Sequence, residues 1–367
     1  MIADLNNWYH GRNVFVTGNT GFKGAWLTAW LRNAGANVAG YALPPTQDRL
    51  NLFRSSGLAL EIDSTLADIC DGAALEQALR AFKPEVVFHL AAQSLVMQSY
   101  VDPLETYRTN VMGTAHVLDA VRRVPSVKAV VVVTSDKCYE NRDDGHLHTE
   151  DEPMGGYDPY SSSKGCAELV TAAYRRSFFD PAAASPPKAA IASARAGNVI
   201  GPGDWAPDRI VPDLITAWVN GTRAKIRNPS AVRPWQFVLE PLRGYLMLGR
   251  ALATEGAEFG SAWNFGPKES EGVSVAELAD RIREALGKQL DVHHETVARS
   301  LHEAAALRLD STKANERLAW SAVLSFSRSI EFTVDGYQRL QSANPDALST
   351  MNSILKSYWA DVDAAQP

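Results

Sequence analysis

The sequence predicts an α/β protein with a Rossmann-like, doubly wound parallel sheet and a smaller C-terminal α/β lobe. A strand-like run at 13–17 leads directly into a glycine-rich turn and a helix-forming stretch at 25–34. Segments typical of strands and helices then alternate five times, up to the β-branched run 127–134. Such alternation predicts parallel strands joined by right-handed crossovers.

The composition narrows the class of protein. With 367 residues, 46% of them hydrophobic, the chain has the material for one large α/β unit or two domains. A net charge of -6 argues against a general nucleic-acid-binding protein. Residues 1–11 lack the apolar core of a signal peptide, and no stretch approaches the roughly 20 apolar residues of a membrane span. We expect a cytoplasmic protein with neither a membrane nor a nucleic-acid partner.

Cysteine usage agrees with that location. Cys70, Cys138 and Cys166 are the three cysteines of the chain. A small, odd number of thiols fits a reducing compartment, and their spacing matches no metal-ligand motif. The sequence therefore predicts neither a disulfide framework nor a metal centre.

The first strand and helix frame a candidate dinucleotide-binding turn. Asn13–Thr17 predicts a strand, and a G-x-x-G-x-x-G turn joins it to the helix at 25–34. Glycines let the backbone approach a pyrophosphate, which then lies at the helix N-terminus. Because the spacing differs from G-x-G-x-x-G, an ordinary glycine-rich turn is the alternative. The residues of this turn expected at the cofactor are Gly18, Thr20, Gly21, Phe22, Lys23 and Gly24.

The predicted second strand, 37–43, ends without an acidic residue. Dinucleotide folds usually place Asp or Glu there to bind the ribose 2′-hydroxyl. The absence weakens the case for NAD over NADP and predicts weaker cofactor binding. Asp68 and Ile69 follow the next apolar segment, where a side chain would meet an adenine ring. Asp68 fits a surface acid equally well.

The middle of the chain supplies two more strands of the sheet. The strand 85–90 is followed by small residues at 91–94, and a long helix is expected over 103–124. The β-branched run 127–134 is typical of a strand buried on both faces. Ser135-Asp136-Lys137 follows it, at the carboxyl edge where such sheets bind ligands.

Tyr160 and Lys164 form a candidate catalytic pair on the helix predicted over 157–179. Residues four apart share a helix face. The Lys164 ammonium would then favour a phenolate and lower the pKa of Tyr160 from about 10. The alternative for the isolated pair is a solvated helix face.

After the strand 190–196 and its glycine-rich continuation 197–203, the alternation of strands and helices becomes less regular. Trp263–Pro267 is typical of a returning strand and turn, and Ser274 begins a helix with Glu277 in the capping-box position. Arginine suits two-point binding of a diphosphate, and a solvated basic surface is the alternative. The arginines concerned are Arg209, Arg223, Arg227 and Arg233.

These boundaries predict two domains. A dinucleotide-binding domain is expected over 1–196, with a returning segment at about 236–266. The remaining segments, 197–235 and 267–367, are expected to form a substrate-binding lobe. The biased segment 181–188 is predicted to be a loop.

Six segments together resemble the extended short-chain dehydrogenase/reductases, and most of all the CDP-D-glucose 4,6-dehydratases. They are TGNTGFKG at 17–24, HLAAQ at 89–93, TSDKCYE at 134–140, YDPYSSSKGCAE at 157–168, ARAGNVIGPGDWA at 194–206 and IRNPSAVRPWQ at 226–236. Two of these features are the most specific to the CDP-D-glucose enzymes. One is Asp136-Lys137, because related dTDP- and GDP-sugar dehydratases carry Asp-Glu at these positions. The other is the segment at 226–236. Family members often have His where this chain has Asn19, Ser230 and Phe237.

The resemblance implies a lyase that binds NAD and CDP-glucose. It implies that Tyr160 takes the C4 hydroxyl proton while NAD+ takes the C4 hydride, and that Lys164 holds the nicotinamide ribose. Ser135 would bond to the C4 oxygen. Asp136 and Lys137 would share the acid and base of water elimination, with Lys137 favoured as the C5 base. A structural ion pair is the alternative for Lys137.

The resemblance also implies the remaining contacts and the assembly. Further cofactor contacts are Asp68, Ile69, Leu90, Ala91, Ala92, Thr109, Tyr160, Lys164 and Arg195. Substrate contacts are Ser94, Asn198, Arg209 and Arg233. A homodimer or dimer of dimers would form through the helices near 103–124 and 157–179. Three alternatives stay open: a dTDP- or GDP-linked dehydratase, a nucleotide-sugar 4-epimerase, which needs no Asp136-Lys137 pair, and a non-enzymatic dinucleotide-binding scaffold.

Overall fold

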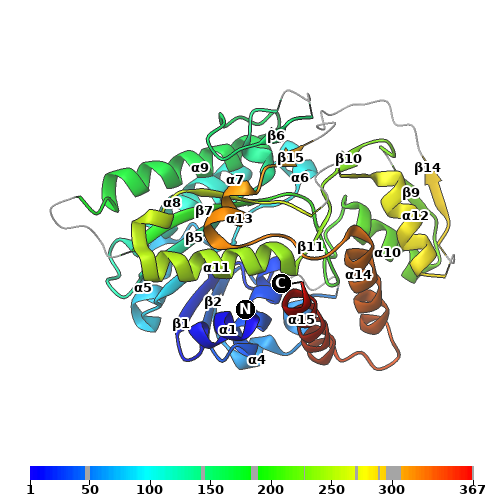
Figure 1. The fold of residues 1–367 in the computed structure, drawn as a ribbon, viewed down its shortest axis with the longest axis horizontal. Coiled ribbons are helices and arrows are strands. Elements are labelled where there is room, and N and C mark those ends of the chain that lie inside the picture. The colour runs from blue at the N-terminus through cyan, green and yellow to red at the C-terminus, as the bar shows by residue number, and fades with distance from the viewer. Residues whose placement is uncertain are drawn as a thin grey trace.

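A seven-stranded parallel sheet runs through the computed structural model in the order β12-β7-β5-β4-β1-β2-β3 (Figure 1). The described residues are 1–45, 50–141, 145–182, 189–226, 228–268, 272–287, 290–294 and 307–365. The strands are β1 (Asn13–Thr17), β2 (Asn37–Ala42), β3 (Asp63–Leu66), β4 (Val86–His89), β5 (Ala129–Val133), β7 (Ala190–Ala196) and β12 (Ala262–Phe265). The strand order reverses at β1 and β4, so the crevice for a ligand opens beyond their carboxyl ends.

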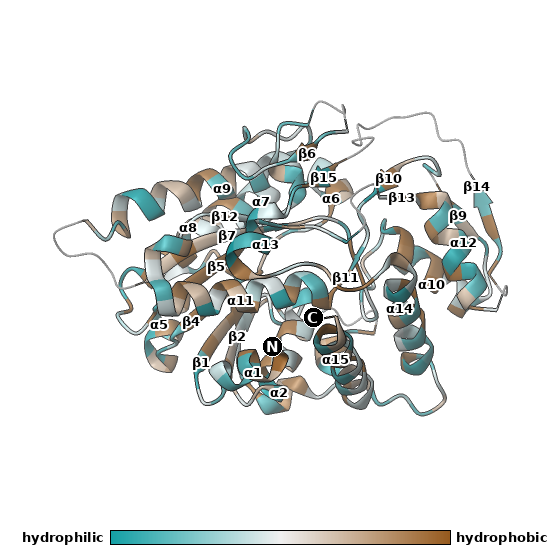
Figure 2. Cartoon of the chain, viewed as in Figure 1, coloured by the Kyte–Doolittle hydropathy of each residue, from teal (hydrophilic) through white to brown (hydrophobic). Residues whose placement is uncertain are grey.

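Helices cover both faces of the sheet, as the alternation predicts (Figure 1). One face carries α1 (Ile2–Tyr9), α2 (Phe22–Asn33), α11 (Leu239–Glu255) and α15 (Ala347–Ala364), and the other carries α5 (Gly72–Phe82), α8 (Gly113–Val121) and α9 (Pro159–Phe178). Alternate residues of one strand enter opposite cores: Val14 and Val16 pack on the first face, and Phe15 packs on the second. Figure 2 shows the apolar character of β1 and β5.

The helix predicted over 103–124 contains a wider turn. It runs as α7 (Pro103–Tyr107), a π-helical turn η1 (Arg108–Met112) and α8. The turn places Asn110 between two elements: its amide oxygen accepts from the Gln93 backbone N–H at 2.9 Å, and its Nδ2 donates to Ser163 Oγ at 2.8 Å. Wide turns of this kind often occur at functional sites. Here the turn ties the end of β4 to the helix that carries Tyr160.

Helix starts follow the sequence closely. Asp158 caps α9 by accepting the Ser161 N–H at 2.9 Å, and Pro159 occupies the first helical position. Ser274 caps α12 (Val275–Ala285) by accepting the Glu277 N–H at 3.1 Å. The expected helix start at Ser274 is therefore confirmed.

A third hydrophobic core forms a lobe at one end of the molecule (Figure 1). It joins α10 (Ile210–Asn220), β9 (Ala224–Ile226), α12 and α14 (Phe326–Leu340), and β14 (Val292–His294) extends β9. The stretch 267–367, predicted as lobe throughout, is divided: Trp320 and α15 pack into the core of the sheet instead. Their large apolar side chains fill the face formed by α2 and α11. With that change, the two-domain division remains our proposal.

The smaller elements complete the chain. They are α3 (Leu52–Ser55), α4 (Leu58–Glu61), α6 (Val96–Val101), η2 (Asp136–Cys138), β6 (Leu147–His148), β8 (Val199–Ile200), β10 (Val232–Arg233), β11 (Gln236–Phe237), η3 (Gly256–Phe259), β13 (Val273–Ser274), β15 (Arg308–Leu309) and α13 (Thr312–Leu318). The predicted loop at 181–188 lies almost wholly outside the described residues, as does Arg227. Within the described ranges, no helix combines the length and hydropathy needed to cross a membrane.

Candidate active site

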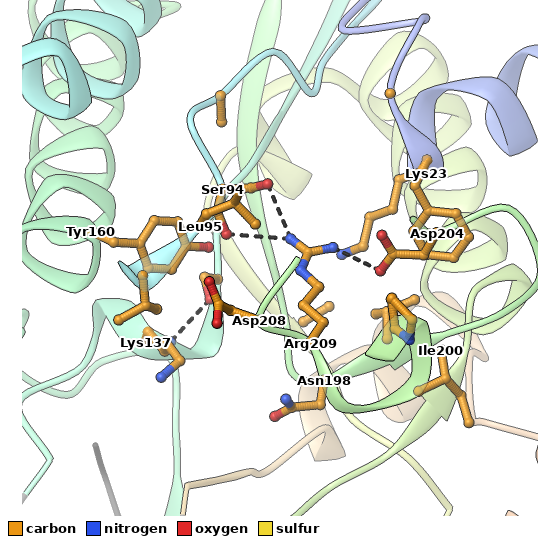
Figure 3. Close-up of a pocket in the computed structure, with 18 of the residues that line it drawn as sticks. Lys23, Ser94, Leu95, Lys137, Tyr160, Asn198, Ile200, Asp204, Asp208 and Arg209 are labelled. Atoms are coloured by element: carbon orange, nitrogen blue, oxygen red, sulfur yellow. Dashed lines mark hydrogen bonds and ion pairs between the residues drawn. The ribbon is translucent and has the colours of Figure 1, made fainter. Parts of the chain in front are cut away.

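A cavity of about 530 Å³ opens at the carboxyl edge of the sheet, between the sheet and the lobe (Figure 3). Its walls come from the turn after β1 and from the segments after β4, β5 and β7. Every residue predicted for catalysis or substrate binding lines it, as does every predicted cofactor contact except Arg195. The fold thus brings together predicted residues that lie up to 215 positions apart in the sequence, from Gly18 to Arg233.

The glycine turn packs too closely against neighbouring backbone to admit side chains at two of its positions. Gly18 has φ +75°, and a Cβ there would lie 2.7 Å from the backbone nitrogen of Ala91. A Cβ on Gly24 would lie 2.0 Å from the carbonyl oxygen of Gly18. Only glycine fits at both positions, so β1, the crevice and the start of α2 meet closely. A tight glycine turn at the start of a helix is the place where dinucleotide-binding folds hold the pyrophosphate, and this one lines the cavity.

The end of β2 offers no carboxylate, as expected. Asn19 explains the glycine there, because a Cβ on Gly40 would lie 2.3 Å from the Asn19 side-chain Cγ. Asp68 lines the cavity, but its carboxylate binds Arg108 at 2.7 Å and accepts the Cys70 N–H at 2.8 Å. Partial burial raises the pKa of Asp68, and these hydrogen bonds outweigh it to give a lowered pKa. Asp68 is thus a paired carboxylate on the cavity wall, beside Ile69.

Ser135, Asp136 and Lys137 follow β5 and begin the short helix η2. Ser135 Oγ donates to Asp136 Oδ1 at 2.9 Å and accepts the Lys137 N–H at 3.2 Å. Burial raises the pKa of Asp136, which is 4% exposed, against the opposing charge of Lys137 and the Ser135 hydrogen bond. The site therefore holds a carboxyl group suited to carry a proton.

Lys137 is the last residue of the Ser135-Asp136-Lys137 segment. Within the described ranges, its ammonium is not ion-paired to any carboxylate, and its side chain lines the cavity. Figure 3 shows it beside Asp208 and near Tyr160. An ammonium placed in this way is available to a bound molecule.

Tyr160 and Lys164 both face the cavity from α9. Tyr160 is 8% exposed and Lys164 is 6% exposed, which excludes a solvated helix face. Burial lowers the pKa of Lys164 to about 8, and its ammonium donates to the Val133 carbonyl at 3.4 Å. Burial raises the pKa of Tyr160 to about 12, with a Ser135 hydrogen bond acting in the opposite direction.

The raised pKa differs from the expectation that Lys164 lowers it. Burial is the larger effect on Tyr160, and the charges acting on the phenol belong to Arg209, Asp136 and Asp158. The Lys164 ammonium instead donates a hydrogen bond to the Val133 carbonyl, and the charge of Glu168 acts to raise its pKa.

Arg195 corrects the predicted list of cofactor contacts. It lies beneath the cavity, where its guanidinium binds Glu168 at 2.9 Å and the Tyr139 hydroxyl at 2.7 Å. Glu168 also accepts hydrogen bonds from Thr134 and Ser193. These contacts use the Arg195 side chain to join β7, β5 and α9. It supports the strands that carry the site and does not reach the cavity.

Arg209 spans the cavity (Figure 3). Its Nη1 binds Asp204 Oδ2 at 2.9 Å, and its Nη2 donates to Ser94 Oγ at 3.0 Å. Asp204 is 4% exposed, and its backbone carbonyl accepts the Tyr337 hydroxyl at 2.5 Å. Sequence reasoning did not single out Asp204, because it becomes a partner of Arg209 only in the folded chain.

The other predicted arginines separate into two groups. Arg233 is 6% exposed and lines the cavity, and its Nη1 donates to the carbonyl of Val232 at 2.9 Å. Arg223 lies on the surface, where its 63% exposed side chain pairs with Asp291. Lys23 adds a buried cation at the same cavity, with its pKa lowered to about 8 by burial and by the charges of Arg209 and Lys164. The site therefore holds several cations and two buried carboxyl groups, those of Asp136 and Asp204.

Comparison with known proteins agrees with this geometry. Residues 15–333 match the family described as GDP-mannose 4,6 dehydratase. The chain is 49% identical over 320 residues to the CDP-glucose 4,6-dehydratase of Salmonella typhimurium, a match that covers 86% of this chain and 87% of that protein.

Solved structures share the architecture. The dTDP-glucose 4,6-dehydratase of Bacillus anthracis, solved with NAD, superposes with a TM-score of 0.74 at 22% identity, covering 90% of this chain and 98% of that one. MoeE5, solved with UDP-glucose and NAD, superposes with a TM-score of 0.74 at 25% identity, covering 90% of this chain and 100% of that one. The Rossmann-like fold predicted from the sequence is confirmed.

Proposed function

The chain belongs to the GDP-mannose 4,6-dehydratase family within the extended short-chain dehydrogenase/reductases, and we propose that it converts CDP-D-glucose to CDP-4-dehydro-6-deoxy-D-glucose and water. The observation that carries this proposal is the placement of Asp136 and Lys137 beside Tyr160 and Lys164 in one cavity. Oxidation at C4 needs the second pair only. Removal of water from C5 and C6 needs an additional acid and base, and the first pair supplies both.

The cofactor is NAD, which accepts the hydride of C4 when bound and returns it to C6, so that no net redox change occurs. The residues proposed to hold it are the glycine turn, the small residues after β4 and the Asp68–Ile69 wall. Gly18 and Gly24 allow the turn to pack tightly against the chain, and both line the cavity. The end of β2 gives the ribose no carboxylate, so we propose weaker binding than in relatives that have one.

Tyr160 is proposed as the base for the C4 hydroxyl. Its hydroxyl is hydrogen-bonded to Ser135, and the buried Lys164 ammonium lies on the same helix face. Ser135 would bond to the C4 oxygen as the ketone forms. The resulting ketone acidifies the proton on C5, which is the premise of the next step.

Lys137 is proposed to remove the C5 proton and Asp136 to protonate the leaving C6 hydroxyl. The raised pKa of Asp136 favours the acid role, since burial stabilises its neutral form. The side chain of Lys137 lines the same cavity as Asp136 and Tyr160, which supports its role as the base. The charge of the adjacent Lys137 acts against the burial that raises the pKa of Asp136.

Substrate contacts are proposed for Ser94, Asn198, Arg209 and Arg233, all on the cavity wall. Arg209 and Arg233 suit a diphosphate because a guanidinium binds phosphate oxygens at two points. The choice of cytidine rests on the Salmonella relative, named for CDP-glucose, and on the segment 226–236.

A homodimer or dimer of dimers is proposed through α7 and α9. Leu104 on α7 is 80% exposed and Leu169 on α9 is 59% exposed. The two helices are joined by the Tyr107 hydroxyl, which donates to Ser162 Oγ at 3.1 Å. Apolar side chains left exposed on neighbouring helices are typical of an interface. We also propose the cytoplasm as the location, where Cys70, Cys138 and Cys166, none of them in a disulfide, would stay reduced.

The deciding experiment supplies the enzyme with NAD+ and, separately, CDP-glucose, dTDP-glucose, UDP-glucose and GDP-mannose. A 4-keto product absorbs in alkali, whereas the product of a 4-epimerase does not. We expect the 4-keto signal to appear fastest with CDP-glucose. A faster signal with another nucleotide would overturn the choice of cytidine, and an epimerised sugar without the signal would overturn the dehydratase.

A further inference from the structure

Two histidines and a glutamate come together outside the cavity, in the segment between Lys137 and Tyr160. His146 Nε2 lies 2.8 Å from Glu152 Oε2, and His148 Nδ1 lies 2.7 Å from the same oxygen. One nitrogen of each ring and the carboxylate oxygen all lie within 4.8 Å of one another. None of the three residues lines the cavity, so the proposed reaction leaves them unexplained.

We propose that His146, His148 and Glu152 form a binding site for a divalent transition metal, with Zn²⁺ as the first candidate. Two imidazoles and a carboxylate, with water in the fourth position, are a frequent donor set for Zn²⁺. Around Zn²⁺, donor atoms stand about 3.3 Å apart. The two nitrogen–oxygen contacts must therefore open by about half an ångström, and the two ring nitrogens, which lie within 4.8 Å of each other, must close by up to about 1.5 Å. The metal would replace the two hydrogen bonds between the imidazole rings and the carboxylate, and each coordinating ring nitrogen would carry no proton.

The donor atoms are held in position before a metal binds. His148 is 1% exposed, its ring stacks on Tyr139 with centroids 4.8 Å apart, and its backbone carbonyl accepts from Asn264 Nδ2 at 2.8 Å. The second oxygen of Glu152 accepts the Thr149 N–H at 2.9 Å. Partners that orient the ligands in this way strengthen metal sites.

The site is also open to solvent and charged for a cation. The side chain of His146 is 42% exposed and that of Glu152 is 26% exposed, which gives an ion a path from solvent. Glu152 is the acidic member of the group, and both imidazole rings contact the same oxygen of its carboxylate. His146 and His148 are two residues apart with ring centroids 4.3 Å apart, as expected of an extended segment that presents both rings on one side.

A bound metal would fasten the segment that connects the two halves of the active site. His148 belongs to β6, which pairs with β15, and its stacking partner Tyr139 binds Arg195. Through these contacts the metal would stiffen the chain between Lys137 and Tyr160. Its role is structural, and the proposal is independent of the reaction proposed above.

The test is Zn²⁺ binding to the full chain carrying no affinity tag, by calorimetry and by metal analysis after dialysis. We expect one Zn²⁺ per chain, a melting temperature that rises with Zn²⁺ because the ion binds the folded state, and visible absorption bands of four-coordinate Co²⁺ when Co²⁺ replaces it. His146→Ala and Glu152→Gln should each weaken binding at least about tenfold. Matched controls are His293→Ala, an exposed histidine on β14, and Asp151→Asn, an exposed neighbouring acid; both should bind as the unchanged chain does.

Two results would overturn the site. The first is an unchanged chain that binds no Zn²⁺ below millimolar concentrations. The second is binding that survives both His146→Ala and Glu152→Gln at unchanged affinity. Glu152→Gln keeps the size of the side chain, so the test remains possible even if His146→Ala disturbs the segment. Circular dichroism shows whether each variant is folded.

Discussion

The Ser135 hydroxyl donates a hydrogen bond of 2.9 Å to the carboxylate of Asp136 in the wall of the cavity. This bond favours the ionised form of Asp136, whereas burial favours the neutral form and prevails. Ser135 therefore sets how far the pKa of Asp136 is raised, in addition to its proposed contact with the sugar. The relationship leads to a test of the acid role.

Ser135→Ala should lower the turnover number and move its alkaline limb to higher pH. Removal of the hydrogen bond leaves burial less opposed, so the pKa of Asp136 rises further. A group that must be protonated to act is lost as pH rises through its pKa, so a higher pKa extends activity upward. The measurement is the pH profile of kcat for both proteins. Two results would contradict an acid role for Asp136. One is an alkaline limb that moves to lower pH in Ser135→Ala. The other is an alkaline limb that disappears in Ser135→Ala but is still present in Asp136→Asn.

Lys164→Met should flatten the rise of stability with pH. In the folded chain the pKa of Lys164 is lowered to about 8, whereas an unfolded lysine titrates near about 10.4. Between these values the unfolded chain binds more protons, so the free energy of unfolding increases with pH. The slope of that free energy, from urea unfolding between about pH 8 and about pH 9.5, should be smaller in the variant. Lys83→Met, at an exposed lysine, is the control. Equal slopes for the unchanged protein, Lys164→Met and Lys83→Met would show that burial does not disfavour the charged form of Lys164.

The sequence predicted the sheet and the cavity wall well because local signals carry both. Alternating apolar residues and caps such as Ser274 act over a few positions, and the carboxyl ends of parallel strands always meet at one edge. Buried networks gave no such signal. The ion pair of Arg195 with Glu168 and the bond of Arg209 to Asp204 depend on packing between distant segments.

The pKa of Tyr160 is another property that local sequence signals did not reveal. The i, i+4 spacing to Lys164 was visible in the sequence, but the degree of burial, which has the larger effect, exists only in the folded chain. Likewise, the apolar residues of α15 gave no indication of which core they join. The helix was predictable, and its packing partner was not.

Arg233→Ala should raise the KM for CDP-glucose while kcat changes little. The loss of charged hydrogen bonds to a diphosphate costs about 2–3 kcal/mol of binding, which corresponds to about 30- to 150-fold in KM. Steady-state kinetics measures this, with Arg281→Ala as the control because Arg281 is an exposed residue of α12. An unchanged KM in Arg233→Ala would remove this residue from the substrate site.

Leu104→Asp combined with Leu169→Asp should convert the proposed dimer to a monomer. Both side chains are exposed in the single chain, so the substitutions leave its core intact, while two charges per subunit would be buried in the interface. Light scattering after size-exclusion chromatography gives the mass. The matched control is Leu60→Asp, whose side chain is 93% exposed on α4. A double variant that keeps the mass of the unchanged protein would place the interface elsewhere.

Lys137→Ala should stop the reaction after C4 oxidation. Tyr160, Lys164 and Ser135 remain, so the first step is retained, but nothing in the proposed scheme removes the C5 proton. Loss of a general base costs about 10²–10⁴-fold in rate, and the matching readout is deuterium uptake at C5 from heavy water, followed by NMR. Lys137→Glu offers another base at the same position and should recover part of the exchange. Rapid C5 exchange in Lys137→Ala would show that Lys137 is not the base, and Asp136, its buried neighbour, would be the next residue to test.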